Sequence, residues 1–267
     1  MTAAERVWQD VEAIRSRAPL IHNITNYVVM NTTANALLAI GASPVMAHAL
    51  EEVEEMTGLA AALVINIGTL SGPWIESMRK AAERARRIGI PIVLDPVGAG
   101  ATRFRTDTAR AFLEDIPPTI LRGNASEVLA LAHDVGGTKG VDSRRTSGEA
   151  REAAGQLAAR YGCVVSVSGA EDLITSGTLT ARVFNGHPLM PRVTGLGCVA
   201  SALSGAFAAV DSDAFRAAVH AMSVMGIAGE IAAEGAEGPA AFQVRFIDAL
   251  FHLDAKEIAG RLRLESD

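Results

Sequence analysis

Cysteine is scarce in this sequence. Cys163 and Cys198 are the only two among 267 residues, and they stand far apart, in no spacing typical of metal ligands. Neither a disulfide framework nor a zinc site is supported, because each needs cysteines in pairs or clusters. Two isolated thiols are typical of a reducing compartment, and we expect a cytoplasmic protein.

Aromatic residues and basic tracts are scarce as well. Aromatic side chains make up only 4% of the chain, and the formal net charge is −6. The densest basic stretch, residues 79–87, has the pattern of the exposed face of a helix. These features disfavour a nucleic-acid partner, which binds through positive surfaces and stacking aromatic rings.

Long uninterrupted apolar runs are missing. Residues 1–19 carry acids and a polar helical period, unlike a signal peptide. Elsewhere, glycine or a charge interrupts each apolar run before it is long enough to cross a bilayer. We therefore expect no membrane partner.

Hydrophobic residues nevertheless make up 49% of the chain, enough for a sizeable core. Short runs rich in Val and Ile alternate with segments of helical period. This alternation is typical of a doubly wound α/β sheet with helices on both faces. The parallel strands are expected at residues 62–68, 90–96, 119–124 and 163–169.

The remaining segments differ in texture. "DLITSG", "TARVFNG" and "HPLMPRV", between residues 172 and 193, are predicted as short strands of an antiparallel edge. Residues 197–210, 213–234 and the terminal segment are predicted to be helical. Residues 136–148 are predicted to form a polar loop. Since no convincing linker is present, we expect one domain, residues 1–267.

Polar and glycine residues follow the expected strands. The strand ends carry "NIGTLSG", "DPVGAGATRFR", "RGNASE" and "SGAED". In open parallel sheets, ligands bind beyond the carboxyl ends of the strands. We therefore expect the functional site at this edge.

The segment "RGNASE" supports two interpretations. Asn124 and Glu127 have the spacing of a capping box, which is a purely structural role. Alternatively, Glu127 holds a hydrated Mg²⁺, which needs few carboxylates, while Arg122 binds phosphate through its planar fork. Asp95, which ends an apolar strand before Pro96, is interpreted either as a turn residue or as a second carboxylate beside a metal-phosphate site.

The segment "VTGLGC" precedes a helical run. Gly195, Gly197 and Ala200 match the spacing of a dinucleotide fingerprint, but we reject that interpretation because helices rather than a βαβ unit follow. The first amides of such a helix can bind an anion. Cys198 is therefore either a small buried hydrophobe or a side chain that faces a phosphate.

The segment from Pro19 to Met46 precedes and includes an apolar helix. Asn23 and Asn26 flank Thr25 before this helix, where helix capping explains part of the pattern. His22 is interpreted as structural. Met46 either lines an apolar pocket or fills the core.

Together these segments resemble the hydroxyethylthiazole kinase family. The resemblance rests on "IHNITNYVVMNTTANALLAIGASPVMAHALEEVEEM", "LVINIGTLS", "VLDPVGAGATRFRT", "ILRGNASE" and "VTGLGC", in this order, and extends from about Pro19 to "EGPAAFQVRFIDAL". It implies a three-layer, ribokinase-like α/β sandwich with a mostly parallel central sheet. It also implies phosphorylation of the hydroxyl of 4-methyl-5-(2-hydroxyethyl)thiazole by ATP and Mg²⁺, in thiamin biosynthesis and salvage, by a homotrimer with active sites between subunits.

The resemblance also implies roles for particular residues. Departures from the family pattern are Ser168 in place of threonine, Leu196 at a position that is usually small, and "GPAAF" in place of a run richer in Gly and Ser. The implied roles are ATP binding for Arg122 and Ser168, substrate binding for Met46, Gly195 and Asn26, Mg²⁺ binding for Asp95 and Glu127, and the catalytic base for Cys198.

The position of Cys198 bears on the mechanism and on the alternatives. A helix N-terminus is expected to lower the pKa of its thiol. A dehydratase of the same fold, acting on damaged nicotinamide cofactor, is disfavoured because an aspartate is expected in place of this cysteine. A non-catalytic nucleotide-binding regulator stays open.

Overall fold

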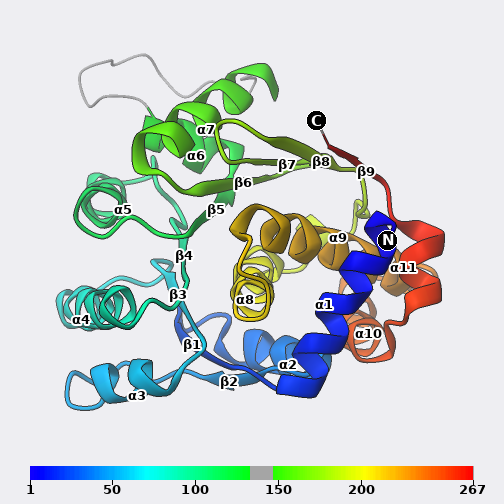
Figure 1. Cartoon of the computed structure of the whole chain (residues 1–267), viewed down its shortest axis with the longest axis horizontal. Coiled ribbons are helices and arrows are strands. Elements are labelled where there is room, and N and C mark those ends of the chain that lie inside the picture. The colour runs from blue at the N-terminus through cyan, green and yellow to red at the C-terminus, as the bar shows by residue number, and fades with distance from the viewer. Residues whose placement is uncertain (133–146, 267) are drawn as a thin grey trace.

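The computed structural model describes residues 1–132 and 147–266 of the chain (Figure 1). The loop predicted at residues 136–148 lies outside the described residues, apart from its last two. The strands are β1 (Leu20–Ile24), β2 (Ser43–Val45), β3 (Ala62–Asn66), β4 (Ile92–Asp95), β5 (Ile120–Asn124), β6 (Val164–Ser168), β7 (Asp172–Thr175), β8 (Thr180–Val183) and β9 (Leu264–Ser266).

Helices account for most of the other described residues. They are α1 (Ala3–Arg17), α2 (Met30–Ile40), α3 (Val53–Leu59), α4 (Gly72–Ile88), α5 (Arg103–Asp115), α6 (Ala125–Ala132), α7 (Ser147–Tyr161), the short 3₁₀ helix η1 (Met190–Arg192), α8 (Leu196–Ala208), α9 (Ala214–Ala233), α10 (Pro239–His252) and α11 (Ala255–Arg261). None of the helices in the described ranges combines the length and apolar character that a membrane span requires.

The strands of the described residues form one nine-stranded sheet in the order β2-β1-β3-β4-β5-β6-β7-β8-β9. Neighbours from β2 to β6 are parallel, and β7, β8 and β9 continue the sheet in antiparallel pairing. The four predicted parallel strands are confirmed as β3, β4, β5 and β6. The predicted antiparallel edge is confirmed for β7 and β8.

Two expectations about the edge were wrong. Residues 187–193 contain η1 instead of a strand, because Pro188 and Pro191 have no N–H groups to donate to a sheet. The terminal segment was expected to be helical, but its end forms β9, which pairs with β8. A three-residue strand is too short to show a period in the sequence.

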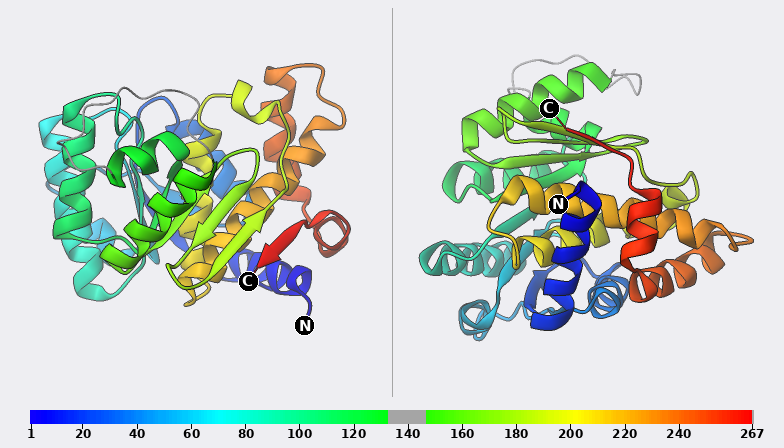
Figure 2. Two further views of the ribbon diagram at one scale, coloured as in Figure 1. Left: turned by 90° about the horizontal axis from the view of Figure 1, so that it is seen from above. Right: turned by 45° about the vertical axis from the view of Figure 1, so that its right-hand side comes forward.

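Helices cover both faces of the sheet, giving a three-layer sandwich (Figures 1 and 2). The helices α3 to α7 lie on one face. On the other face lie α2, α8 and α9, with α1, α10 and α11 packed outside them. Two buried clusters of apolar side chains, one on each face, form the core.

The helix α4 shows how the sequence defines these layers. Pro73 stands at its start, and Gly89 ends it in the left-handed region with φ of 75°. Its buried residues follow a helical period and face the sheet, while its charges face outward. These buried residues are Trp74, Ser77, Met78, Ala81, Ala82 and Ala85.

The helix α8 is different because it is buried on nearly all sides. It packs against β3 and β4 on one side and against α9 and α2 on the others. A Cβ atom at Gly205 would lie 2.7 Å from Val64 Cγ2, so only glycine permits this close approach of helix to sheet. The small residues of α8 therefore bring its N-terminus to the carboxyl edge of the sheet.

Candidate active site

A cavity of about 370 Å³ opens at the carboxyl edge of the sheet, where the sequence predicted the site. It lies beyond the ends of β3, β4, β5 and β6 and in front of α8. All the predicted site residues except Met46 line it. The lining residues are Asn26, Val28, Val29, Gly68, Asp95, Val97, Arg122, Asn124, Glu127, Ser168, Thr194, Gly195, Gly197 and Cys198.

The N-terminus of α8 forms one wall of the cavity. Gly195 precedes the helix with φ of 88°, and no side chain caps the helix start. A Cβ atom at Gly195 would lie 2.7 Å from Val29 Cγ1, so a side chain does not fit there. The first amides of α8 have no intrahelical acceptors, and they give this wall an affinity for anions.

Arg122 extends from β5 into the same wall and is only 6% exposed. A Cβ atom at Gly197 would lie 3.0 Å from Arg122 Nη1, so the guanidinium packs against the start of α8. Its buried Nε has no hydrogen-bond acceptor among the described residues. A buried cationic donor without a partner is costly, and a bound anion such as phosphate would remove this cost.

Glu127 confirms the structural interpretation of "RGNASE". Its Oε2 accepts a hydrogen bond from Asn124 N at 2.8 Å, and Glu127 N donates to Asn124 Oδ1 at 2.9 Å, which completes a capping box. Its Oε1 accepts from Gly98 N at 2.9 Å. Each carboxylate oxygen has a second lone pair, so the cap leaves Glu127 able to accept a further ligand from the cavity.

Asp95 is the last residue of β4 and is 1% exposed. Its Oδ2 accepts hydrogen bonds from Asn66 Nδ2 and Ser201 Oγ, both at 2.7 Å. These donors belong to β3 and α8, so the carboxylate is held between sheet and helix rather than in a turn. Burial raises the pKa of Asp95 to about 7, and the charge of Glu127 adds to this rise, while Arg122 opposes it.

Cys198 is the third residue of α8 and is partly exposed to the cavity. Its Sγ accepts a hydrogen bond from Asn26 Nδ2 at 3.5 Å. The expectation of a lowered thiol pKa was wrong: burial, followed by the nearby Asp95 carboxylate, raises the pKa of Cys198 to about 11. Desolvation of the thiolate therefore outweighs the helix N-terminus, and the group is a thiol at neutral pH.

Ser168 ends β6 and connects the cavity to a second one. Its Oγ donates to Gly123 O at 3.5 Å. It also lines a neighbouring cavity of about 420 Å³, whose lining includes the apolar residues Ala125, Val167 and Leu173 and the charged residues Arg151, Glu171 and Arg182. The loop after Ser168 is held by Asp172, whose Oδ1 accepts from Gly169 N at 3.0 Å.

Residues of the N-terminal segment fall into different places. Met46 follows the edge strand β2 and lies outside the lining of the cavity, so its contact with substrate stays a prediction. The expected caps at Asn23 and Asn26 were wrong, because the N-cap of α2 is Val29, without a side-chain hydrogen bond. Asn26 instead bonds within the site.

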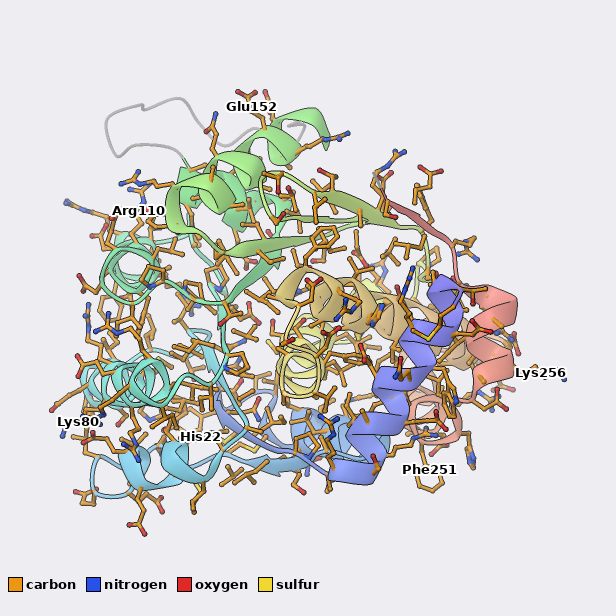
Figure 3. All side chains as sticks on the ribbon, viewed as in Figure 1. His22, Lys80, Arg110, Glu152, Phe251 and Lys256 are labelled. Atoms are coloured by element: carbon orange, nitrogen blue, oxygen red, sulfur yellow. The ribbon has the colours of Figure 1, made fainter. Side chains whose placement is uncertain are left out.

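His22 is a structural residue, as the sequence indicated. It lies buried on the α3 side of β1 (Figure 3). Its Nδ1 is 3.0 Å from Thr57 Oγ1 and its Nε2 is 2.7 Å from Ala47 O. Burial lowers the pKa of His22, which favours the neutral ring.

Three residues that support the site were not predicted from the sequence. Asn66 and Ser201 bind Asp95, and Arg105 donates to Val97 O and Gly68 O, both at 2.7 Å, which braces the loops after β3 and β4. Asn66 carried a readable signal, since it is a polar residue at the end of an apolar strand, as Asp95 is. Ser201 stands one helical turn after Cys198.

Fold and site together define a class of protein. A mostly parallel sheet between two helix layers carries an anion-binding helix start, a buried arginine and two carboxylates at its carboxyl edge. This combination is that of a ribokinase-like phosphotransferase.

Comparison with known proteins narrows the class. The family model described as "Hydroxyethylthiazole kinase family" matches residues 11–256. The hydroxyethylthiazole kinase of Syntrophus aciditrophicus (strain SB) is 60% identical over 261 residues, with 97% of each chain covered. That of Leptospira biflexa (strain Patoc 1 / Ames) is 58% identical over 254 residues, with 95% of each chain covered. The chain therefore belongs to the hydroxyethylthiazole kinase family.

Solved structures agree with this assignment. The hydroxyethylthiazole kinase protein of Pyrococcus horikoshii OT3 superposes with a TM-score of 0.92 at 46% identity, covering 98% of this chain and 99% of that one. A pyridoxal kinase of Staphylococcus aureus, solved with pyridoxal, has a TM-score of 0.63 at 15% identity, covering 79% of this chain and 87% of that one. The second likeness shows the shared fold alone.

Proposed function

We propose that the protein phosphorylates the hydroxyl of 4-methyl-5-(2-hydroxyethyl)thiazole, using ATP and Mg²⁺, in thiamin biosynthesis and salvage. The observation that carries the proposal is that the guanidinium of Arg122, which packs against Gly197, and the first amides of α8 border one cavity. Both are donors for phosphate oxygens.

The phosphate chain of ATP would lie against these donors. Phosphoryl transfer has a loose transition state, so positioning and charge stabilisation supply most of the catalysis. The donors are fixed in place by the fold: Arg122 by β5 and the helix amides by the Gly195 turn. Fixed donors of this kind stabilise developing charge without having to reorganise.

Asp95 and Glu127 would hold Mg²⁺. Both line the cavity, and both have lone pairs beyond those used by the protein, which fits an ion that prefers a few carboxylates and several waters. When bound, the ion would neutralise charge on the transferring phosphate. The ionisation of Asp95, whose pKa is raised to about 7, would be favoured by such a cation.

The nucleoside of ATP would occupy the second cavity. This space adjoins the phosphate site through Ser168, which lines both cavities. Its apolar lining residues offer burial to a base, and Ser168 Oγ offers a hydrogen bond at the junction. The serine keeps the hydroxyl that the family pattern places here on threonine.

The acceptor alcohol would lie between the phosphate and Cys198, with Asn26, Gly195 and Met46 as contacts. Its oxygen would attack the γ-phosphorus, the bond from this phosphorus to the bridging oxygen of ADP would break, and the hydroxyl proton would pass to the Cys198 thiolate. Because the pKa of Cys198 is raised to about 11, little thiolate is present at neutral pH. General-base help, typically worth about 10²-fold or more, is therefore a smaller contribution than charge stabilisation.

We also propose how the protein assembles. The chain would be one cytoplasmic domain, and three copies would form a homotrimer with active sites between subunits. A site at a subunit boundary would account for Met46, which a single chain leaves outside the cavity. Small molecules, rather than nucleic acid or membrane, are its proposed partners.

The experiment is incubation of the purified protein with ATP, Mg²⁺ and the thiazole alcohol, followed by mass detection. A phosphate ester of the alcohol, absent when either ATP or the alcohol is left out, supports the proposal. ATP binding without turnover would favour a regulator. ATP-driven repair of hydrated nicotinamide cofactor, without the ester, would favour the dehydratase.

A further inference from the structure

Asn66 stands at the centre of a hydrogen-bond chain that runs behind the cavity. Its Oδ1 accepts from Asn26 Nδ2 at 2.8 Å and from Gly68 N at 3.0 Å, and its Nδ2 donates to Asp95 Oδ2 at 2.7 Å. The residue is 1% exposed and does not line the cavity. One buried side chain therefore connects β3 and β4 with the segment that follows β1, and these three strands lie side by side facing α8 (Figure 1).

The orientation of the Asn66 amide is fixed by its partners. The N–H of Gly68 can only donate, so the oxygen of Asn66 must face it. A carboxylate such as Asp95 accepts, so the nitrogen of Asn66 must face Asp95. Reversing the amide would set Asn66 Nδ2 against the Gly68 N–H and Asn66 Oδ1 against the Asp95 carboxylate. Both hydrogen bonds would then be lost in a buried place, which is costly.

Asn66 in turn fixes Asn26. Asn26 Nδ2 donates one hydrogen to Asn66 Oδ1 and the other to Cys198 Sγ. Gly68 packs against the same amide so closely that an added Cβ would lie 2.5 Å from Asn26 Nδ2. Because both N–H groups of Asn26 are used, its Oδ1 is the atom left to accept a hydrogen bond from a ligand in the cavity.

We infer that Asn66 is a positioning residue that holds the alcohol side of the site, Asn26 and Cys198, in register with the phosphate side, Asp95. This inference rests on the proposed function and extends it. Asn66 acts through two neighbours without touching substrate. Its loss would leave Asn26 free to turn and would remove one of the two donors that hold Asp95.

The test compares variants that break different links of the chain. Asn66→Ala breaks both links, Asn26→Ala breaks the alcohol link, and Ser201→Ala removes the other donor to Asp95 without touching Asn26. For each we would measure kcat, KM for both substrates and the Kd of the thiazole alcohol by calorimetry without nucleotide. Asn23→Ala is the control for removal of a buried asparagine, since Asn23 donates to Ile21 O within β1 and lies outside the hydrogen-bond chain of Asn66.

The expected result is coupling between Asn66 and Asn26. Each single alanine variant should lower kcat/KM for the alcohol by roughly 10-fold, and the double variant by little more than one of them. Residues in contact commonly couple by a factor of about 2 to 150. When Ser201→Ala and Asn26→Ala are combined, their separate losses in kcat/KM should instead multiply. Asn23→Ala should lower the melting temperature and leave KM unchanged.

Asn66→Asp separates the two links. It keeps an oxygen for Asn26 and Gly68 but replaces the amide donor that faces Asp95, and it preserves the shape of the side chain. We expect the KM and Kd for the alcohol to stay near the wild-type values while kcat falls. This variant also serves if Asn66→Ala fails to fold.

Either of two results would overturn the inference. The first is a multiplicative effect of Asn66→Ala and Asn26→Ala, and the second is an alcohol Kd that Asn66→Ala leaves unchanged. If the wild type itself forms no phosphate ester, the proposed function fails first, and that outcome is visible before any variant is made.

Discussion

The two edges of the sheet differ in what their polar groups do. A cavity of about 570 Å³ at the amino edge, near the end of α8, exceeds the candidate active site in volume. Yet the buried carboxylate in the lining of this cavity, that of Asp211, is fully paired. Its Oδ2 accepts a hydrogen bond from Arg216 Nε and its Oδ1 accepts one from Arg216 Nη2, both at 2.5 Å. At the carboxyl edge, Arg122 Nε lacks an acceptor among the described residues.

The difference indicates that the pairing of charged groups, rather than cavity volume, distinguishes the candidate active site from the larger cavity. Removing one partner of a buried ion pair leaves an uncompensated charge and destabilises a fold, and a buried donor that has no partner is likewise retained at a cost. The helix α8 joins both edges, so variants at its two ends test the comparison within one element.

The largest effect is expected from the two arginines. Arg122→Ala should lower kcat/KM for ATP by about 10²- to 10³-fold, because a fixed charge on the phosphates is lost. The melting temperature of this variant should change little, because Arg122 Nε has no acceptor among the described residues and its removal breaks no hydrogen bond there. Steady-state kinetics and thermal melting would check both statements.

Arg216→Ala is the matched control at the other edge. It should destabilise the fold by about 1 to 3 kcal/mol, because Asp211 is left buried without its partner. Its kcat and KM should match the wild type at a temperature where the variant is folded. Unaltered ATP kinetics in Arg122→Ala would contradict the phosphate assignment.

A smaller effect is expected from the two cysteines. Cys198→Ala should lower kcat by about 10²-fold while keeping ATP binding. Cys163, which is buried and whose pKa is raised to about 12, should be replaceable by alanine without loss of turnover. The measurement is kcat with calorimetric ATP binding for both variants.

The pH dependence sharpens this prediction. If the Cys198 thiolate is the base, its fraction grows with pH toward the raised pKa of about 11, so wild-type kcat should keep rising above neutral pH. Cys198→Ala should lack that rise. An identical pH profile in both proteins would remove the base role.

Two glycines of α8 give a further contrast. Gly197→Ala places a methyl group 3.0 Å from Arg122 Nη1, and we expect a loss of activity of roughly 10-fold with a small stability change. Gly205→Ala places one 2.7 Å from Val64 Cγ2, and overpacking of this kind costs about 1 to 3 kcal/mol of stability. An equal loss of stability in Gly197→Ala and Gly205→Ala would contradict the expected difference between the two ends of α8.

The smallest effect concerns stability and pH at Asp95. Its folded-state pKa of about 7 lies above the ordinary 3.8, so the folded state binds more protons between these values. The free energy of unfolding therefore falls as pH rises through this window. Asparagine cannot ionise, so the stability of Asp95→Asn relative to the wild type should increase as pH rises from about 4 to about 7 in melting experiments.

Asp172→Asn provides the comparison for that measurement. Burial raises the pKa of Asp172 to about 6, so the same gain should appear over a narrower range. A melting-temperature difference between Asp95→Asn and wild type that is constant with pH would contradict the account.

The sequence allowed much of the fold and most of the site to be predicted. Apolar runs of β type are local signals, so β3 to β6 and the polar strand ends were readable. The family motifs then identified the residues that line the cavity. The capping box of Asn124 and Glu127, one of the two interpretations of that segment, was confirmed, and its pattern is also local.

The errors share a physical cause. The pKa of Cys198 depends on its burial in the folded chain and on the nearby Asp95 carboxylate, which spacing in the sequence does not reveal, so a local helix effect was overestimated. Asn26 was read as a cap because its partners, Asn66 and Cys198, are distant in sequence. The strand β9 (Leu264–Ser266) pairs with β8 (Thr180–Val183), which precedes it by some 80 residues. The three residues of β9 carry no sign of this distant partner.

The most direct measurement is a crystal structure of the protein with Mg²⁺, a non-hydrolysable ATP analogue and the thiazole alcohol. We predict a phosphate oxygen within about 3.2 Å of a guanidinium nitrogen of Arg122 and the terminal phosphate facing the amides of Leu196 to Cys198. A triphosphate bound elsewhere, out of contact with Arg122, would contradict this prediction.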